Sequence, residues 1–577
     1  MYYKVPCIST AVSWALLACV AQAASNGYCP PLGPVLPPPT SPSTYPTYGT
    51  AADELIAKLK ELTSSFNSSA VSIGVRSVHE ATPLFEFHHS PPESDPAGVS
   101  VVDSDTVYRL ASMTKLFTVL GVLRIESISF EDPITKYLPE LRDMNEQAPT
   151  QDAIHIVDWD SITIGALAAH QSGVGADLAV DLVNLPGDWI SKGFPPADNA
   201  TLLGCSGFFG QRPCDSEDFF AHFGRRPPVF APFTTASYSN VGFMLLGLVI
   251  QKMTNQTYED WMQHSILDPI GMNLSFTSKP SNSLGFIPTN DTNWGIDIGV
   301  EAPTGALYST ITDLLALGTS ILSYDMLSPA KTRKWMKPMS ATSSISTFVG
   351  APWEIYRSNN LTEDGRMIEF YTKAGDLFNY HSSIALIPDY DLVMVALVAG
   401  PEVSSSTPYQ LIGEAATALL PVVEQAGKAA AETQYAGTYS DVSTNSSLTL
   451  STDNGPGLSI TKWQVRGVDV IATPMFSNDL LENPPPVRLY PMNLSTANKT
   501  TWRAVFQDLT ADEAAAHDAL FPWAEFSCGS WGVLDRIVYQ FQGRDSFVFD
   551  MVDGGEGTSK ASTLNLSGYR VALTRTS

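Results

Sequence analysis

The sequence predicts an α+β domain followed by a smaller all-β domain. A helical pattern and two strands open the first domain, and after Gly427 the pattern changes to short strands separated by Asn, Asp, Gly and Pro turns. The length of 577 residues exceeds the size at which a single hydrophobic core usually stops growing. We therefore expect segments at 1–23, 24–50, 51–425 and 426–577.

The first segment, 1–23, has the pattern of a secretory signal peptide. Lys4 precedes an apolar run from Ala11 to Ala21, and Ala21-Gln22-Ala23 fits a small-residue cleavage site. The run is shorter than the roughly 20 residues that span a bilayer, so a membrane anchor is the weaker alternative. We expect a secreted, extracellular protein, in which the Pro-rich segment 24–50 forms an extended arm.

Secretion changes how the cysteines and asparagines are interpreted. Cys205 and Cys214 are expected to form a disulfide across a short loop, and Cys29 and Cys528 then pair by elimination. Asn-x-Ser/Thr sequons predict glycosylation at solvated positions. They lie at Asn67, Asn199, Asn255, Asn273, Asn290, Asn360, Asn445, Asn493, Asn498 and Asn565.

The charge of the chain argues against one class of partner. The formal net charge is -26, and the basic residues form no cluster. Because nucleic-acid binding needs clustered Lys and Arg to displace counterions, we expect no nucleic-acid partner.

Apolar periodicity gives the elements of the first domain in order. A long insertion without clear periodicity lies between Asp177 and Pro228. The expected elements are a helix over 51–66, strands over 70–78 and 83–88, helices over 116–125 and 241–253, strands over 381–387 and 391–398, and a helix over 411–425. In the second domain we expect strands at 435–439, 447–450, 458–460, 468–471 and 487–490.

Three short motifs stand out, in the order Ser112-Met113-Thr114-Lys115, Tyr238-Ser239-Asn240 and Lys373-Ala374-Gly375. At helical spacing Ser112 and Lys115 share one face, so the ammonium can reach the hydroxyl. Ser112 would also begin a helix, whose unpaired N–H groups stabilise a developing oxyanion. The first motif alone is weak, because any helix with a Ser and a Lys three residues apart produces it.

A serine nucleophile needs a base, and a lysine with a pKa of about 10.4 is protonated at neutral pH. A second cation about 4 Å away would lower that pKa enough, and Lys373 is the candidate. A phenol between two ammonium groups is favoured as phenolate, so Tyr238 is either the base or the acid that protonates the leaving group. The sequence leaves the choice between Lys115 and Tyr238 open.

Around these motifs the chain resembles the serine β-lactamase and penicillin-binding-protein family, in its class C β-lactamase and esterase branch. The resemblance spans roughly residues 51–425 and is carried by Val107–Lys115, Ile162–Leu167 with His170–Gly173, Tyr238–Gly247, Thr304–Thr310 and Asp313-Leu314. It implies a β-lactamase/transpeptidase-like fold, in which an α/β part is pressed against an all-α part with the site between them. The C-terminal domain resembles, more weakly, the lipocalin-like barrels appended to some members.

The resemblance also implies the roles of the site residues. Ser112 would be the acylated nucleophile, with Lys115 and Tyr238 in proton transfer. Lys373, counted with the catalytic residues, would orient the substrate together with Asn240. Asn240, Gly375 and Asp376 would bind the substrate, and the backbone N–H of Asp376 would be the second oxyanion donor. Relatives that bind carboxylate-bearing β-lactams or peptides commonly carry Ser or Thr where this chain has Asp376. Unless that side chain points away, neutral esters or amides and cationic amines are favoured over anionic substrates.

The sequence thus predicts a secreted serine hydrolase that acts on a small ester or amide. The alternatives are an acyltransferase acting on a secondary metabolite and a non-catalytic ligand-binding member. A Ser-His-Asp assignment with His170 and Ser172 is disfavoured because a Gly-x-Ser-x-Gly elbow is missing. No cofactor or metal is expected, since His79, His88 and His89 lack metal-ligand spacing.

Overall fold

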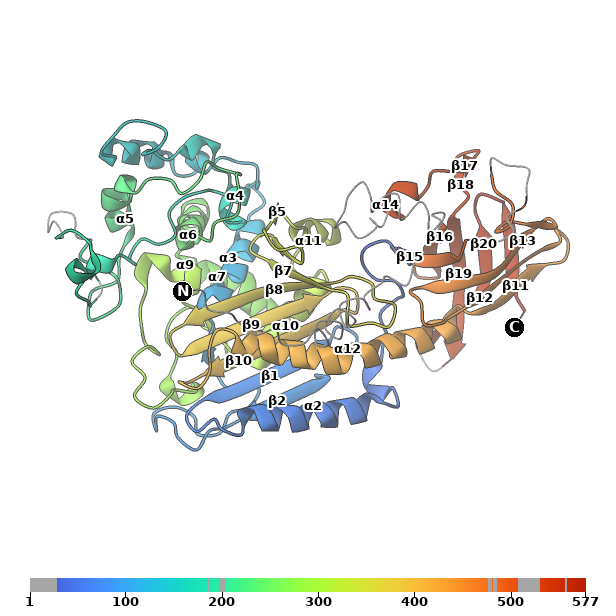
Figure 1. Cartoon of the computed structure of the whole chain (residues 1–577), viewed down its shortest axis with the longest axis horizontal. Coiled ribbons are helices and arrows are strands. Elements are labelled where there is room, and N and C mark those ends of the chain that lie inside the picture. The colour runs from blue at the N-terminus through green and yellow to red at the C-terminus, as the bar shows by residue number, and fades with distance from the viewer. Residues whose placement is uncertain are drawn as a thin grey trace, which may run out of the picture. The chain divides into compact units, whose positions relative to one another are not determined.

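The computed structural model describes residues 28–184, 186–196, 203–475, 480, 485–506, 530–555 and 558–576. The chain divides into two compact units (Figure 1). The first, here called the sheet unit, consists of Pro46–Arg357 and Glu369–Leu419. The second, the barrel unit, contains the described residues up to Tyr45, the segment Ser358–Ile368, and the chain from Leu420 onward.

The sheet unit is built around one antiparallel sheet of eight strands in the order β2-β1-β10-β9-β8-β7-β6-β5. Its strands β1, β9 and β10 are almost entirely buried, and β10 is accordingly a continuous apolar run in the sequence. The strand bounds are β1 (Ala70–Ser77), β2 (Phe85–His89), β5 (Ser340–Ala341), β6 (Thr347–Val349), β7 (Glu354–Ser358), β8 (Ile368–Leu377), β9 (Tyr380–Ile387) and β10 (Leu392–Ala399). A separate short ladder joins β3 (Tyr108–Arg109) to β4 (Tyr308–Ser309).

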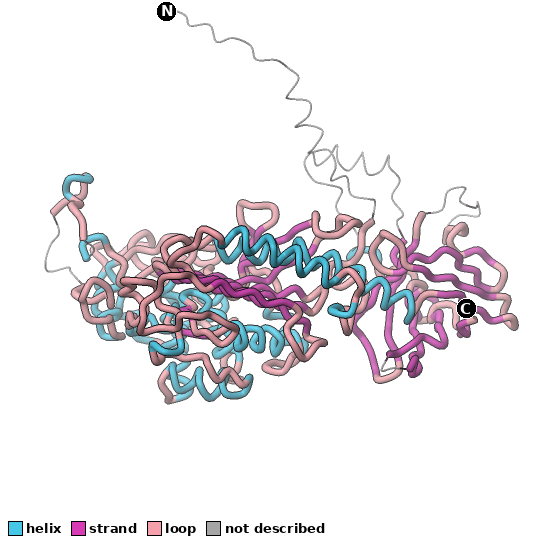
Figure 2. Tube along the Cα trace, turned by 90° about the horizontal axis from the view of Figure 1, so that it is seen from below, coloured by secondary structure: helices cyan, strands magenta, loops and turns pink. Residues whose placement is uncertain are grey.

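Helices surround this sheet, which Figure 2 shows as a magenta layer among cyan coils. Helix α10 packs against β1, β9 and β10, and α2 packs against β2. Gly74 permits the close approach of α10, since a Cβ there would lie 2.5 Å from Ile311. The helix bounds are α2 (Tyr48–Thr63), α3 (Thr114–Leu123), α4 (Ile164–Ala168), α5 (Ser216–His222), α6 (Asn240–Thr254), α7 (Tyr258–Met262), α8 (Asp268–Ile270), α9 (Ala302–Gly305), α10 (Ile311–Leu322), α11 (Pro329–Trp335) and α12 (Thr407–Gln434).

Helices α3, α4, α6, α7 and α9 pack on one another and form the all-α part of the sheet unit. Leu116, Phe243 and Leu246 are among its fully buried side chains. They belong to a single apolar core that also includes Ala70, Ile384 and other sheet residues. None of the helices in the described part of the chain combines the length and apolarity needed to cross a membrane.

The barrel unit contains a sheet in the order β12-β11-β21-β20-β19-β16-β15-β13-β14, and β12 also pairs with β13, so the sheet closes. Aromatic side chains fill the interior: the rings of Trp463 and Phe547 lie 5.1 Å apart, and those of Tyr435 and Trp502 lie 4.9 Å apart. The bounds are β11 (Gly437–Asp441), β12 (Ser446–Ser451), β13 (Leu458–Val465), β14 (Val468–Asp469), β15 (Val487–Thr496), β16 (Lys499–Phe506), α14 (Ser530–Val533), β17 (Val538–Tyr539), β18 (Gln542–Gly543), β19 (Ser546–Gly555), β20 (Thr558–Leu566) and β21 (Val571–Arg575).

The prediction of an α+β domain followed by an all-β domain is confirmed. The closing helix, expected to end at 425, instead runs as α12 to Gln434, through Pro421 and Gly427. The Pro-rich arm is not simply extended, since Pro42–Thr44 forms a 3-10 turn. Val35 and Leu36 are buried against the barrel unit, because apolar side chains between prolines gain by packing on its surface.

The disulfide between Cys205 and Cys214 is confirmed. Cys29 is also disulfide-bonded, and its predicted partner Cys528 lies outside the described residues. The predicted signal peptide and the sequon at Asn199 lie outside them as well.

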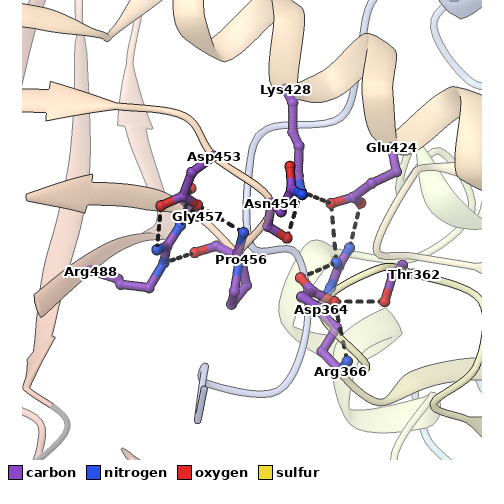
Figure 3. Close-up of polar contacts among 11 residues, drawn as sticks. Thr362, Asp364, Arg366, Glu424, Lys428, Asp453, Asn454, Pro456, Gly457 and Arg488 are labelled. Carbon is purple, nitrogen blue, oxygen red and sulfur yellow. Dashed lines mark hydrogen bonds and ion pairs between the residues drawn. The ribbon is translucent and has the colours of Figure 1, made fainter. Parts of the chain in front are cut away.

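A buried ion-pair network holds the segment Ser358–Ile368 in the barrel unit (Figure 3). The guanidinium of Arg366 donates to Asp364 at 2.8 Å and to Glu424 of α12 at 2.6 Å, and its side chain is 3% exposed. Lys428 lies 3.8 Å from Glu424 and donates to the Asn454 carbonyl. Arg366 faces both carboxylates, so its removal would leave Asp364 buried without this cation, while Glu424 would keep Lys428.

We expect Arg366→Ala to lower the free energy of unfolding by about 3 kcal/mol or more, because Asp364 would stay buried without its cation and Glu424 would keep the more distant Lys428, 3.8 Å away. Chemical denaturation would measure the loss. The matched control is Arg142→Ala, which breaks a pair with Asp160 whose side chains are 51% and 58% exposed and should cost less than about 1 kcal/mol. Equal losses in the two variants would contradict the prediction.

Candidate active site

Ser112 lies in a 3-10 turn, Ala111–Met113, that leads directly into α3. The turn is fixed on both sides: Leu110 N–H donates to the Leu307 carbonyl at 2.8 Å, and the Leu110 carbonyl accepts from Ser382 Oγ of β9 at 2.7 Å. Ala111 has φ of +49°, a left-handed backbone conformation that residues other than glycine adopt only at a cost in free energy. The strained turn places Ser112 at the start of a helix, as the spacing of the first motif predicts.

Lys115 contacts Ser112 directly. Its Nζ donates to Ser112 Oγ at 3.0 Å and to the Thr304 carbonyl of α9 at 2.9 Å, and its side chain is completely buried. Burial lowers the pKa of Lys115 below 10.5, the charge of Lys373 lowers it further, and Tyr238 acts in the opposite direction. Burial therefore contributes more to this shift than Lys373, the cause that the sequence suggested.

Tyr238 precedes α6, whose first turn is capped by the Ser239 hydroxyl accepting from Gly242 N–H at 3.1 Å. The ammonium groups of Lys115 and Lys373 lie 5.0 Å and 5.4 Å from the centroid of the Tyr238 ring. Although 44% of the residue is exposed, its hydroxyl lies among these cations and Ser112. Burial alone would raise the pKa of Tyr238, but the two lysines and hydrogen bonds with Ser112 and Lys115 outweigh it and lower the pKa below 10.0.

His170 packs against Tyr238. Its ring stacks on Tyr238 at 4.3 Å, and its Nδ1 accepts a hydrogen bond from Ser239 N–H at 3.1 Å. Burial, with Lys115 and Lys373 nearby, holds the pKa of His170 well below its usual value, so the ring is neutral at physiological pH.

Lys373 lies on β8 with its side chain 1% exposed. Its Nζ donates to Glu354 Oε1 of β7 at 2.6 Å and to the Ala374 carbonyl at 2.7 Å. Burial alone would lower the pKa of Lys373, but the interactions with Glu354 and Tyr238 outweigh burial and raise this pKa above 10.5. Lys373 is therefore a fixed cation beside the more easily deprotonated Lys115.

Gly375 brings β8 against the serine turn. A Cβ at this position would lie 1.9 Å from the Leu110 carbonyl oxygen, so only glycine fits there. The side chain of the next residue, Asp376, is 59% exposed and has its Oδ1 2.9 Å from Nδ1 of the buried His381. The β8–β9 ladder produces this pair, because Asp376 and His381 are register partners.

Two carboxyl groups that the sequence did not single out lie on the other side of the site. Asn240 Nδ2 donates to Asp177 Oδ1 at 2.5 Å, and Asn240 Oδ1 is buried with no hydrogen-bond partner among the described residues. Glu301 is buried and accepts from Leu178 N–H at 3.3 Å. Burial and then Asp177 raise the pKa of Glu301 to about 7, against the opposing effects of Leu178 N–H and Lys115.

The structure thus brings together Ser112, Lys115, Tyr238 and Lys373, with Asn240, Gly375 and Asp376 on the flanking elements. Sequence reasoning missed Glu354, Asp177 and Glu301, and gave no role to Thr304. None of these four belongs to the three short motifs, although Thr304 begins the segment Thr304–Thr310 that carries part of the resemblance. Among the described residues, one group of side chains lies close enough together to hold a metal ion: Cys205, Cys214 and Asp218. The two cysteine sulfurs of this group are joined in the disulfide.

Two family models match the chain. The model described as Beta-lactamase covers residues 93–417, and the model described as Beta-lactamase-like-like, C-terminal domain, covers 427–577. The first match spans more than half of the sequence. The chain belongs to the β-lactamase family.

Curated relatives agree with this assignment. A "Beta-lactamase-like protein" of Arthroderma benhamiae is 30% identical over 93% of this chain and 95% of its own length. The "Probable hydrolase clz13" of Cochliobolus lunatus is 28% identical, and the "Probable hydrolase M10" of a Phoma species is 30% identical, each over 70% of this chain and 68% of its own length. This β-lactamase-family chain therefore has relatives named as hydrolases.

We expect Glu301→Gln to stabilise the protein in a pH-dependent way. The folded pKa of about 7 lies above the ordinary 4.5, so the native state binds more protons than the unfolded state between these values. The contribution of Glu301 to stability is complete below the ordinary pKa and is lost as the pH rises through about 7.

The variant should therefore match the wild type near pH 4 and exceed its free energy of unfolding by about 3 kcal/mol near pH 8, as measured by chemical denaturation. Glutamine keeps an acceptor for Leu178 N–H, so the variant changes little but the charge. A stability difference that does not change with pH would contradict the prediction.

Proposed function

We propose that the chain is a secreted serine hydrolase that forms an acyl-enzyme on Ser112 and hydrolyses a small ester or amide. The observation that carries the proposal is the contact of 3.0 Å between Ser112 Oγ and the Nζ of a buried lysine whose pKa is lowered. A neutral Lys115 amine, or a Tyr238 phenolate, accepts the Ser112 proton as Oγ attacks the carbonyl carbon.

The rest of the site supports the later steps. The start of α3 directs backbone N–H groups toward the developing oxyanion, and Gly375 brings the backbone of β8 close to the same turn. Collapse of the tetrahedral intermediate expels the alcohol or amine, which takes up the proton held by Lys115 or Tyr238. Water then attacks the acyl-enzyme and gives a proton to the same base. Breakdown of the second tetrahedral intermediate releases the carboxylic acid, and the proton returns to Ser112 Oγ.

Both candidate bases have a pKa shifted toward neutrality, so the choice between Lys115 and Tyr238 stays open. Transfer of the acyl group to an alcohol or amine would use the same acyl-enzyme and differ only in the second nucleophile. We assign no cofactor to this chemistry, and the proposed partner is the small-molecule substrate.

Extracellular localisation is part of the proposal and is supported by sequence features. The pattern of residues 1–23 favours export, and the asparagines of the described sequons are exposed except Asn565. Asn565 Nδ2 donates to the Val548 carbonyl and, at 2.8 Å, to Asp550 within the barrel unit. We therefore propose glycosylation at the exposed sequons and not at Asn565.

We expect Ser112→Ala to lower kcat/KM by at least about a thousandfold while the fold is retained. Turnover of activated esters and D-amino-acid amides would measure the loss, and the intact mass of the deglycosylated protein would show an acyl adduct in the wild type alone. The matched control is Ser172→Ala, because Ser172 is a buried serine close to His170 in sequence.

The control variant should retain wild-type activity. Ser112→Ala with near-normal turnover would refute the proposed nucleophile. Acylation of Ser112 with transfer to an added alcohol in preference to water would identify an acyltransferase.

A further inference from the structure

The ammonium group of Lys373 is already occupied. A lysine has three N–H donors, and here Glu354 Oε1 and the Ala374 carbonyl accept two of them at 2.6 and 2.7 Å. The ring of Tyr238 lies against the same ammonium, 5.4 Å away. Only 1% of the Lys373 side chain is exposed, so little of its surface is accessible to a charged group of a substrate.

Glu354 is held firmly in this position. Its Oε2 accepts hydrogen bonds from Ala374 N–H at 3.0 Å and from the Tyr409 hydroxyl of α12 at 3.0 Å. The carboxylate therefore binds the side chain of Lys373 and the backbone of the next residue at once. This arrangement joins β7 to the motif strand β8 and neutralises the fixed cation of the site.

The exposed charge beside Gly375 has the opposite sign. Asp376 follows Gly375 on β8, and 59% of its side chain is exposed. On the far side of the site Asp177 adds a second carboxylate next to Asn240. The remaining cation, Lys115, is completely buried and donates to Ser112 and the Thr304 carbonyl. A substrate carboxylate would find repulsion here and no free cation among these groups.

We propose that Glu354 is a positioning residue that keeps Lys373 from binding a substrate carboxylate, so that the enzyme acts on esters or amides that carry no carboxylate. This inference rests on the proposed function and deepens it by naming the substrate class. It also assigns a role to a residue outside the three motifs.

Two esters of matched size test the inference. p-Nitrophenyl butyrate and p-nitrophenyl hemisuccinate share a leaving group and differ in having a terminal methyl or carboxylate. The wild type should prefer the butyrate by at least about thirtyfold in kcat/KM, the size of effect that one unpaired charge produces. Glu354→Gln should reduce this preference at least about tenfold, mainly through a lower KM for the hemisuccinate.

The matched control is Tyr409→Phe, which removes one hydrogen bond to Glu354 but keeps its charge. Its preference should stay within about twofold of the wild type, since the charge balance is unchanged. Asp376→Asn should reduce the preference independently of Glu354→Gln.

The pH profile gives a readout that a purely structural role would not move. Without the carboxylate, the full charge of Lys373 acts on Tyr238 and Lys115 and favours their deprotonated forms, so the acid limb of kcat/KM should move to lower pH. The titratable groups that surround this ammonium are Glu354 and Tyr356 of β7, Tyr238, Lys115 of α3, His170, and Tyr409 behind Glu354.

Equal wild-type activity on the two esters would overturn the inference while leaving a hydrolase. An equal loss of kcat on both esters in Glu354→Gln, with an unmoved pH profile, would also overturn it and leave Glu354 a structural residue. If neither these esters nor the amide panel acylates Ser112 in intact-mass measurements, the proposed function itself fails and the inference fails with it.

Discussion

The buried ammonium of Lys115 is the constraint on which the arrangement of the site depends. An amine enclosed in an apolar core must find hydrogen-bond partners there, and Lys115 finds the Ser112 hydroxyl and the Thr304 carbonyl. Because these partners come from the start of α3 and from α9, the packing of the helical part sets the distance between amine and nucleophile. The same burial lowers the pKa of Lys115, the shift that the proposed role as a base requires.

The sheet supplies the second half of the site. Strand β9 holds the serine turn through Ser382, and β8 passes so close to that turn that position 375 must be glycine. The same strand carries Lys373, whose charge is stabilised by Glu354, so one lysine remains a fixed cation while the other titrates more easily. Helices and sheet thus set different electrostatic properties around one hydroxyl, a division consistent with the hydrolases among the relatives of this chain.

Residues that lie close in sequence or belong to the three short motifs were the ones that sequence reasoning could predict. Helical spacing alone placed Lys115 beside Ser112, and the pattern of apolar residues located β1, β9 and β10 within a residue or two of their bounds. The partner of Lys373 could not be found this way, because Glu354 precedes it by 19 residues and meets it only through the pairing of neighbouring strands. Helix α12 exceeded its expected end because packing outweighs the local preferences of Pro421 and Gly427.

The segment Ser358–Ile368 leaves the sheet unit, joins the barrel unit and returns as β8. The strand that carries Lys373 therefore starts from residues whose buried partner, Glu424, comes about sixty positions later in the chain. During synthesis Arg366 and Asp364 must wait for that later segment before their charges are fully paired. Removal of the chain from Leu420 onward would consequently not be a simple domain deletion, since it would take one of the two carboxylates from a buried cation a few residues before the strand that carries Lys373.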